Sequence, residues 1–231
     1  MITTNRFYKL FIIYIIASAF SCVLSVVRPF LFGRTAYLFL IWNLFLAWIP
    51  FVLSGVINHI YQNAQKRMWA KILLGLCGVL WLVFFPNAPY MLTDFVHFSG
   101  RNFLNFSNGV IPFEAWYDFI VFSSFIITGF LIGFISMRIV HMIVKNMLGT
   151  VWGWIFAFVS LSLGSYAIYL GRFIRLNSWD IWHNPAKLAE SVSNSFSPTN
   201  LLFVILLTMM LFVLYLAFSG IVNMGEDRNK E

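Results

Sequence analysis

The most constraining feature of this sequence is a series of long apolar runs with almost no charge inside them. A helix that crosses a bilayer needs about 20 mostly apolar residues, and six segments meet that requirement. They are residues 7–27, 37–57, 68–85, 119–137, 148–170 and 201–222. Hydrophobic residues make up 61% of the chain and charged residues only 10%, more apolar surface than a water-soluble fold could bury. The sequence predicts an all-α fold, a polytopic transmembrane helical bundle of about six spans, forming one integral membrane domain over residues 1–231.

The distribution of basic residues predicts how the bundle is oriented. Six spans place both termini on one side of the membrane, together with the second and fourth loops. That side carries nine basic residues: Arg6, Lys9, Lys66, Arg67, Lys71, Arg138, Lys145, Arg228 and Lys230. The other side carries six: Arg28, Arg34, Arg101, Arg172, Arg175 and Lys187. The excess of basic residues on cytoplasmic loops in membrane proteins therefore predicts a multi-pass protein of the cell membrane with cytoplasmic termini.

The composition also excludes several classes of function. No polar stretch is long enough to form a soluble enzyme domain. The formal charge of +7 comes from basic residues scattered at the ends of apolar runs, so no nucleic-acid partner is predicted. Both cysteines, Cys22 and Cys77, lie inside apolar runs, where a thiol behaves as a small hydrophobic group. No cofactor is predicted, and membrane lipid is the expected partner.

A polar segment directly follows the third apolar run. Asn87 can cap a new helix with Pro89 in its first turn, and that helix would place Asp94 and His97 on one face. Ionisable groups in such apolar surroundings are candidates for function. We therefore select Asn87, Tyr90, Asp94 and His97 as binding residues. The alternative is that Asp94 pairs with an arginine and merely holds helix ends together.

Asp118 is a further candidate, at the start of the fourth run. Glu114 precedes it, and an acidic residue in a first helical turn is sufficiently explained by the helix dipole. Asp118 is harder to explain in this way because a long uncharged run follows it at once.

The segment after the fifth run carries the remaining candidates. Arg172 and Arg175 would share a helical face, and two guanidinium groups there could bind carboxylates or a phosphate. They could equally be cations that flank a span. Asn177, Trp179 and Asp180 follow them and complete the candidate set. A short interfacial helix is expected over residues 184–192, because Asn184-Pro185 is a helix-start signal.

Two spacing patterns need a separate interpretation. The D-x-x-H spacing occurs at Asp94 with His97 and again at Asp180 with His183. Neither segment carries a recognised metal signature, so no metal site is predicted. Gly129 and Gly133, four residues apart in the fourth run, permit close helix packing. Contact within the chain is the expected use, while a homo-oligomer or another membrane-protein partner stays open.

At these polar segments the chain resembles a family of uncharacterised bacterial membrane proteins, known as domain of unknown function 1361. The resemblance rests on P-N-A-P-Y at residues 86–90 with T-D-x-x-H at residues 93–97, W-Y-D at residues 116–118, and G-R-F-x-R-x-N-S-W-D at residues 171–180. His183 lies outside these patterns. The resemblance covers the chain from about the third span through the fifth loop, implies a membrane protein, and supplies no activity.

Three functions are compatible with these observations. The leading hypothesis is a binding or catalytic site for an anionic lipid or polyprenyl-phosphate headgroup at the extracytoplasmic interface. The second is a structural or assembly protein without a ligand. A transporter ranks last, because the middles of the six predicted spans lack charge. The sequence leaves open whether any reaction is catalysed.

Overall fold

The computed structural model describes residues 4–64, 67–99, 111–175 and 197–228, together with His183, Ala186 and Val192. Within these residues all regular structure is helical. The elements are α1 (Thr4–Phe32), α2 (Leu38–Ala64), α3 (Met68–Phe84), α4 (Asn87–Tyr90), η1 (Met91–Phe95), α5 (Val96–Ser99), α6 (Phe113–Leu148), α7 (Thr150–Tyr169), η2 (Leu170–Ile174) and α10 (Pro198–Arg228). Six helical segments are long and apolar enough to cross a membrane, which confirms the predicted fold class.

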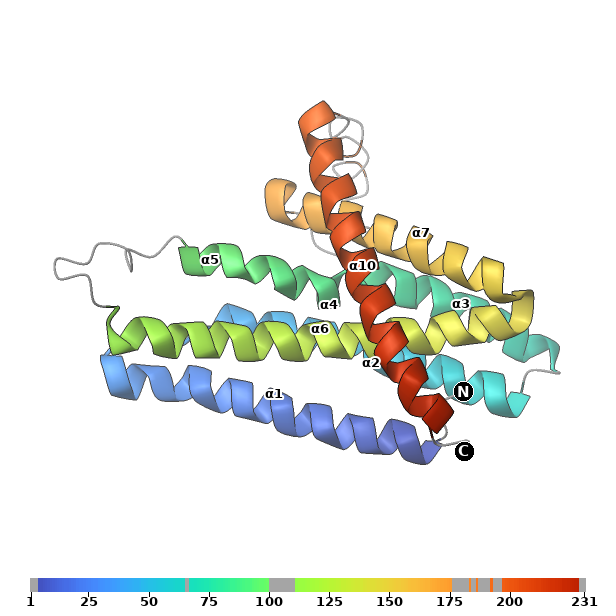
Figure 1. Cartoon of the computed structure of the whole chain (residues 1–231), viewed down its shortest axis with the longest axis horizontal. Coiled ribbons are helices and arrows are strands. Elements are labelled where there is room, and N and C mark those ends of the chain that lie inside the picture. Colours follow the sequence, from blue (N-terminus) through green and yellow to red (C-terminus); the bar gives the residue numbers. More distant parts are fainter. Residues whose placement is uncertain are drawn as a thin grey trace.

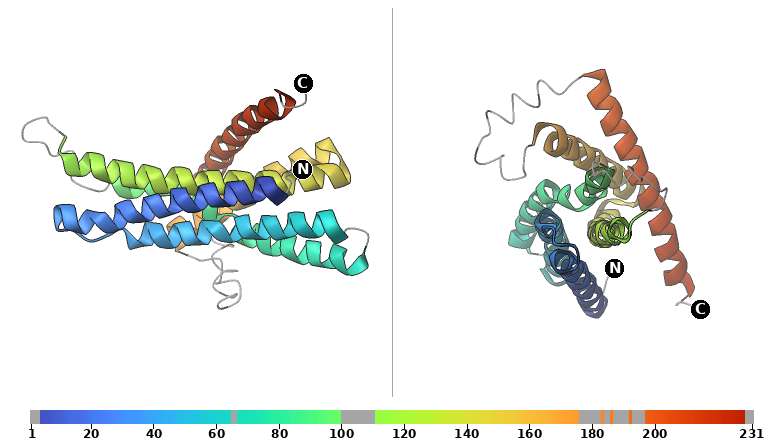
Figure 2. Two further views of the ribbon diagram at one scale, coloured as in Figure 1. Left: turned by 90° about the horizontal axis from the view of Figure 1, so that it is seen from below. Right: turned by 90° about the vertical axis from the view of Figure 1, so that its left-hand side faces the viewer.

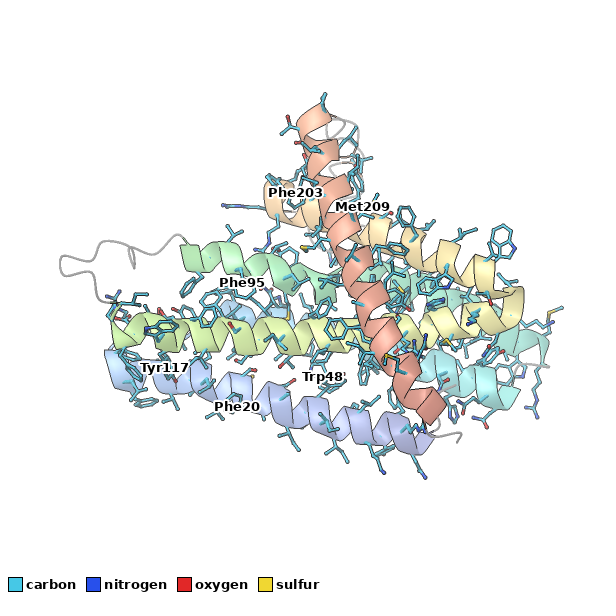
Figure 3. All side chains as sticks on the ribbon, in the orientation of Figure 1. Phe20, Trp48, Phe95, Tyr117, Phe203 and Met209 are labelled. Atoms are coloured by element: carbon cyan, nitrogen blue, oxygen red, sulfur yellow. The ribbon has the colours of Figure 1, made fainter. Side chains whose placement is uncertain are left out.

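Helix α6 is the central element of the bundle. It packs against α1, α2 and α7, while α10 packs on α7. Figure 1 shows α1, α2 and α6 running along the long axis, with α10 (red) crossing them obliquely, and Figure 2 shows the same arrangement from two further sides. Apolar side chains such as Phe20 and Met209 lie on the outer surface (Figure 3), exposed at 56% and 51%. Such an outer surface suits contact with lipid.

The fourth span is longer than the sequence predicted. The apolar run ends at Met137, so Arg138 was expected in a loop, but α6 continues to Leu148. Arg138 and His141 are buried within it, at 5% and 3% exposure. The chain then turns at Gly149, whose φ of 100° favours glycine, and α7 begins at the next residue. This correction places an arginine inside a span that the sequence indicated to be uncharged.

Short helices follow α3, as predicted, and continue its course (Figure 1). Asn87 has a different role from the predicted helix cap, because the N-cap position of α4 is Pro86. Pro89 has no N–H for the carbonyl of Phe85, which accepts from Ala88 N instead at 3.2 Å. Asn87 Nδ2 donates to the carbonyl of Phe84 at 2.9 Å. The asparagine thus satisfies a carbonyl at the break between α3 and α4.

The two glycines of α6 allow these short helices to lie directly against it. A Cβ at Gly133 would come within 2.6 Å of the Cβ of Ala88, and one at Gly129 would overlap the sulfur of Met91. Both neighbours belong to the α4–η1 segment. The predicted contact within the chain is therefore confirmed, and it sets the position of the residues that follow Met91.

Candidate functional site

Three carboxylate side chains are described by the structure, Asp94, Glu114 and Asp118, and all lie near the same end of the bundle. Helices α1 and α7 end there, while α2 and α6 begin there. The carboxylates divide into two clusters with different surroundings. One cluster is closed, and the other borders an open cleft.

The closed cluster joins α1 to α6 through Arg28 and Asp118. Arg28 Nε donates to Asp118 Oδ1 at 2.6 Å, and Nη2 donates to Oδ2 at 2.8 Å. The two side chains are 1% and 0% exposed. Tyr37 donates its hydroxyl to Asp118 Oδ2 at 2.5 Å, and Arg28 also donates to the carbonyl of Thr35 at 3.0 Å. These bonds compensate two charges that would be costly to bury alone.

Glu114 completes this cluster at its rim. Its Oε1 lies 3.2 Å from Arg28 Nη2 and 2.9 Å from the Nε of Arg34, whose side chain is 64% exposed. The helix dipole alone therefore does not explain Glu114, because this residue also bridges two arginines. Among the described residues, this cluster contains two cations and two carboxylates.

The second cluster is organised by Arg172, which joins the η1 region to the end of α7. Nε donates to Thr93 Oγ1 at 2.5 Å, and Nη1 to His97 Nε2 at 3.0 Å. Nη2 donates to Asp94 Oδ1 and to the carbonyl of Tyr90, the latter at 3.4 Å. The guanidinium carbon lies 3.8 Å from the centroid of the Tyr90 ring, a cation–π contact. The arginine partner that the sequence analysis considered for Asp94 is therefore present, and it is Arg172.

Asp94 is fully buried, and both of its oxygens accept hydrogen bonds. Oδ2 accepts from Asn43 Nδ2 of α2 at 3.0 Å. A cleft of about 430 Å³ opens beside this pair. Its lining residues are Phe39, Asn43, Tyr90, Asp94, His97 and Arg172. The cleft brings together side chains from α2, the α4–α5 segment and η2.

His97 is exposed and lines this cleft. A guanidinium can only donate hydrogen bonds, so the Nε2 atom that faces Arg172 must be the acceptor. With Nε2 as the acceptor, the ring hydrogen lies on Nδ1. Phe39 packs edge-on against the imidazole, with ring centroids 5.3 Å apart.

Local backbone irregularity separates Arg172 from Arg175. Residues 170–174 form η2, a single π-helical turn, and such turns are frequent at functional sites. Arg175 ends it in the left-handed conformation, with φ 62° and ψ 37°. The prediction that the two arginines share a face assumed a regular α-helix and is wrong in that respect. Arg175 is exposed and is absent from the cleft lining, whereas Arg172 forms part of it.

The structure brings together Tyr90, Asp94, His97 and Arg172 from the predicted set. Asp118 belongs to the closed cluster, and Asn87 lies at the helix break. The candidates Asn177, Trp179 and Asp180, and most of the helix expected over residues 184–192, lie outside the described residues.

Sequence reasoning missed Phe39, Asn43 and Thr93 as parts of the cleft cluster, and Arg28 as the partner of Asp118. Asn43 offered a signal, since an amide inside an apolar span is rarely without a partner. No group of three or more histidine, cysteine or acidic residues able to hold a metal ion occurs in the part of the chain that the structure describes.

Comparison with known proteins gives one family-level result. No curated protein matches the chain, and neither does a solved structure. A family model described as "Protein of unknown function (DUF1361)" matches residues 42–214, which include every residue of the cleft except Phe39. The match covers most of the chain, and the protein therefore belongs to the DUF1361 family.

Proposed function

We propose that the cleft binds the phosphate-bearing headgroup of an anionic membrane lipid, a phospholipid or a polyprenyl phosphate, at the extracytoplasmic interface. The observation that carries this proposal is the set of donors around the cleft. Asp94 is covered, because both its oxygens already accept hydrogen bonds. The second hydrogens of Asn43 Nδ2 and Arg172 Nη1, and the Nδ1 hydrogen of His97, find no acceptor among the described residues. Phosphate oxygens are strong acceptors that match such donors.

The contrast between the two clusters supports the same proposal. In the closed cluster the ion pair of Arg28 with Asp118 is at most 1% exposed, which is what a purely structural tie requires. In the cleft cluster Arg172 is 17% exposed and His97 is exposed, so a ligand can reach both. A tie between helix ends needs no such opening.

The burial of arginines strengthens the orientation that the proposal assumes. Buried or ion-paired arginines report poorly on membrane insertion, because their charge is compensated within the protein. Removing the buried Arg138 from the nine basic residues on the terminal side leaves eight. Removing Arg28, Arg34 and Arg172 from the six on the cleft side leaves three. The wider margin supports cytoplasmic termini and an extracytoplasmic cleft.

A structural or assembly role is the second candidate, and a specific observation favours it. Arg172 uses four of its five N–H groups within the protein, on Thr93, His97, Asp94 and the carbonyl of Tyr90. A guanidinium so engaged ties the α4–α5 segment to the end of α7 without any ligand. The two candidates differ in whether a lipid is retained.

The test is to identify lipids that copurify with the full-length protein in mild detergent, by mass spectrometry of the extracted lipids. We expect one phosphate headgroup class to be enriched over the bulk membrane, and Arg172→Gln to lower that enrichment. Arg34→Gln is the matched control, because Arg34 is 64% exposed and lies outside the cleft lining. Lipid in the proportions of the bulk membrane, unchanged by Arg172→Gln, would favour the assembly role instead.

A further inference from the structure

A second hollow lies at the opposite end of the bundle, between the first turns of α1 and the last turns of α2. Its volume is about 320 Å³. It is lined by Phe7, Tyr8, Phe11, Val52, Gly55, Val56, Asn58, His59 and Gln62. The cleft beside Asp94 shares none of these residues. We call this hollow the α1–α2 groove.

The close approach of Phe7 to α2 shapes the groove. A Cβ at Gly55 would come 2.4 Å from Cζ of Phe7, so only glycine allows the ring to lie there. The same ring stacks on Phe51 with centroids 5.0 Å apart. Toward the middle of the helices the groove is apolar, with Phe11 and Val52 along it. Its apolar part thus runs toward the centre of the bundle.

The mouth of the groove is polar and lies at the helix ends. Tyr8, His59 and Gln62 line it, and Gln62 Nε2 donates to Asn58 Oδ1 at 3.2 Å. Tyr8 and His59 are exposed. An apolar trough with a polar mouth at the end of two spans matches the shape of an amphiphile in a bilayer, whose chain lies deeper than its headgroup.

The described charged side chains around this mouth are all basic. Arg6 and Lys9 flank Tyr8 and are exposed, and Arg67 and Lys71 lie at the start of α3, which packs on α2. The first 93 residues of the sequence contain no aspartate or glutamate. Helices α1, α2 and α3 therefore contribute only cations to this end of the bundle, and Glu226 and Asp227 of α10 have side chains outside the described part of the chain. Anionic lipids are attracted to such basic clusters at a membrane surface.

We propose that the α1–α2 groove binds one anionic phospholipid, with an acyl chain along Phe11, Val52 and Val56 and its phosphate at the mouth beside His59 and Gln62. Shape and charge select the same ligand, because the trough accepts a hydrocarbon chain and the surrounding cations accept a phosphate. The site is independent of the function proposed for the Asp94–Arg172 cleft, since the two lie at opposite ends of α2.

The experiment uses full-length protein reconstituted in vesicles that hold equal amounts of phosphatidylglycerol and phosphatidylcholine with the same chains. Native mass spectrometry then measures which lipid stays bound on release. Wild-type protein should retain phosphatidylglycerol over phosphatidylcholine. Val56→Trp fills the groove and should lower this preference, whereas Val79→Trp, at an exposed α3 position outside the lining, should preserve it. Both comparisons are repeated in an Arg172→Gln background, where the cleft contributes less to lipid retention, and the same difference between the two tryptophan variants is expected there.

A charge variant tests the headgroup contact without filling the groove. His59→Glu changes an exposed residue and should lower the ratio of phosphatidylglycerol to phosphatidylcholine about fivefold, as expected for one charge near an anionic headgroup. Met147→Glu places the same charge at the end of α6, outside the lining, and should leave the ratio unchanged. Equal retention of both lipids by wild-type protein would overturn the proposal. The proposal would also be overturned if Val56→Trp and His59→Glu both left the ratio of phosphatidylglycerol to phosphatidylcholine unchanged. A dimer of this chain that Val56→Trp dissociates would overturn it as well.

Discussion

Arg28 and Asp118, 90 residues apart in sequence, form a two-bonded ion pair that is almost completely shielded from solvent. Asp94 has a different arginine, Arg172, and a different environment, because its pair borders a cleft. Of the three aspartates that the sequence selected as candidates, the two that the structure describes therefore have different roles. Asp118 holds α1 to α6, and Asp94 belongs to the candidate site.

Removing one member of the Arg28–Asp118 pair should destabilise the protein strongly. Asp118→Leu or Arg28→Leu leaves the other charge buried, at a cost of about 3–5 kcal/mol. The double change Arg28→Leu with Asp118→Leu should recover most of that loss, because an apolar pair can fill the same space. Unfolding in detergent, followed by circular dichroism, measures the difference. A double variant no more stable than the single variants would contradict a purely structural role for this ion pair.

The packing of α6 against the α4–η1 segment predicts opposite effects for two glycine substitutions. Gly133→Ala would bring a Cβ within 2.6 Å of the Cβ of Ala88 and should cost about 1–3 kcal/mol through overpacking. Gly75→Ala on α3 has no atom within 4 Å of the added Cβ and should stabilise its helix by about 0.5–1 kcal/mol. Thermal unfolding of both glycine variants measures these two changes in stability. Equal shifts in the unfolding temperature would mean that the close approach at Gly133 does not affect stability.

A buried serine links three spans near the centre of the bundle. Ser136 donates to the carbonyl of Pro50 and accepts from the indole N–H of Trp81, both at 2.8 Å. Ser136→Ala leaves the buried Trp81 N–H without an acceptor and should cost about 1–3 kcal/mol. Adding Trp81→Phe should recover part of the loss, because the unpaired donor is removed as well. A single variant as stable as wild type would show that the indole finds another partner.

The orientation of the chain is tested by reporter fusions. A phosphatase reporter, which is active outside the cytoplasm, should be inactive after Lys230 and active near Asn102. A reporter that is active only in the cytoplasm should give the reverse pattern at both positions. An extracytoplasmic C-terminus would contradict the proposed orientation and would place the cleft on the cytoplasmic side.

The apolar runs were sufficient to predict the number of spans, because a segment of about 20 apolar residues has few other uses. Their ends were less predictable. Arg138 follows the apolar run of the fourth span, yet α6 continues to Leu148, and Arg138 Nη2 donates to Asn223 Oδ1 of α10 at 2.8 Å. That contact depends on tertiary packing and leaves no trace in the local sequence.

The pairing of charges was also only partly predictable from the sequence. The contact of Arg172 with Asp94 was predictable, because charges in apolar surroundings need partners and these two lie on the same side of the membrane. Arg28 has the sequence context of any cation that flanks a span, so nothing local indicated its burial. The left-handed turn at Arg175 and the π-helical turn before it also break the regular spacing on which face assignments depend.

We propose that the pair of Arg172 with Asp94 serves a ligand and not only the fold. The most direct measurement is headgroup-specific lipid retention by the double variant Arg172→Leu with Asp94→Leu, alongside its thermal unfolding. We expect unfolding to return close to that of wild type, because neither charge is left unpaired. We also expect the headgroup enrichment to fall, because an apolar pair cannot donate hydrogen bonds to a phosphate. Recovered stability together with unchanged lipid retention would contradict a ligand role and assign the pair to structure alone.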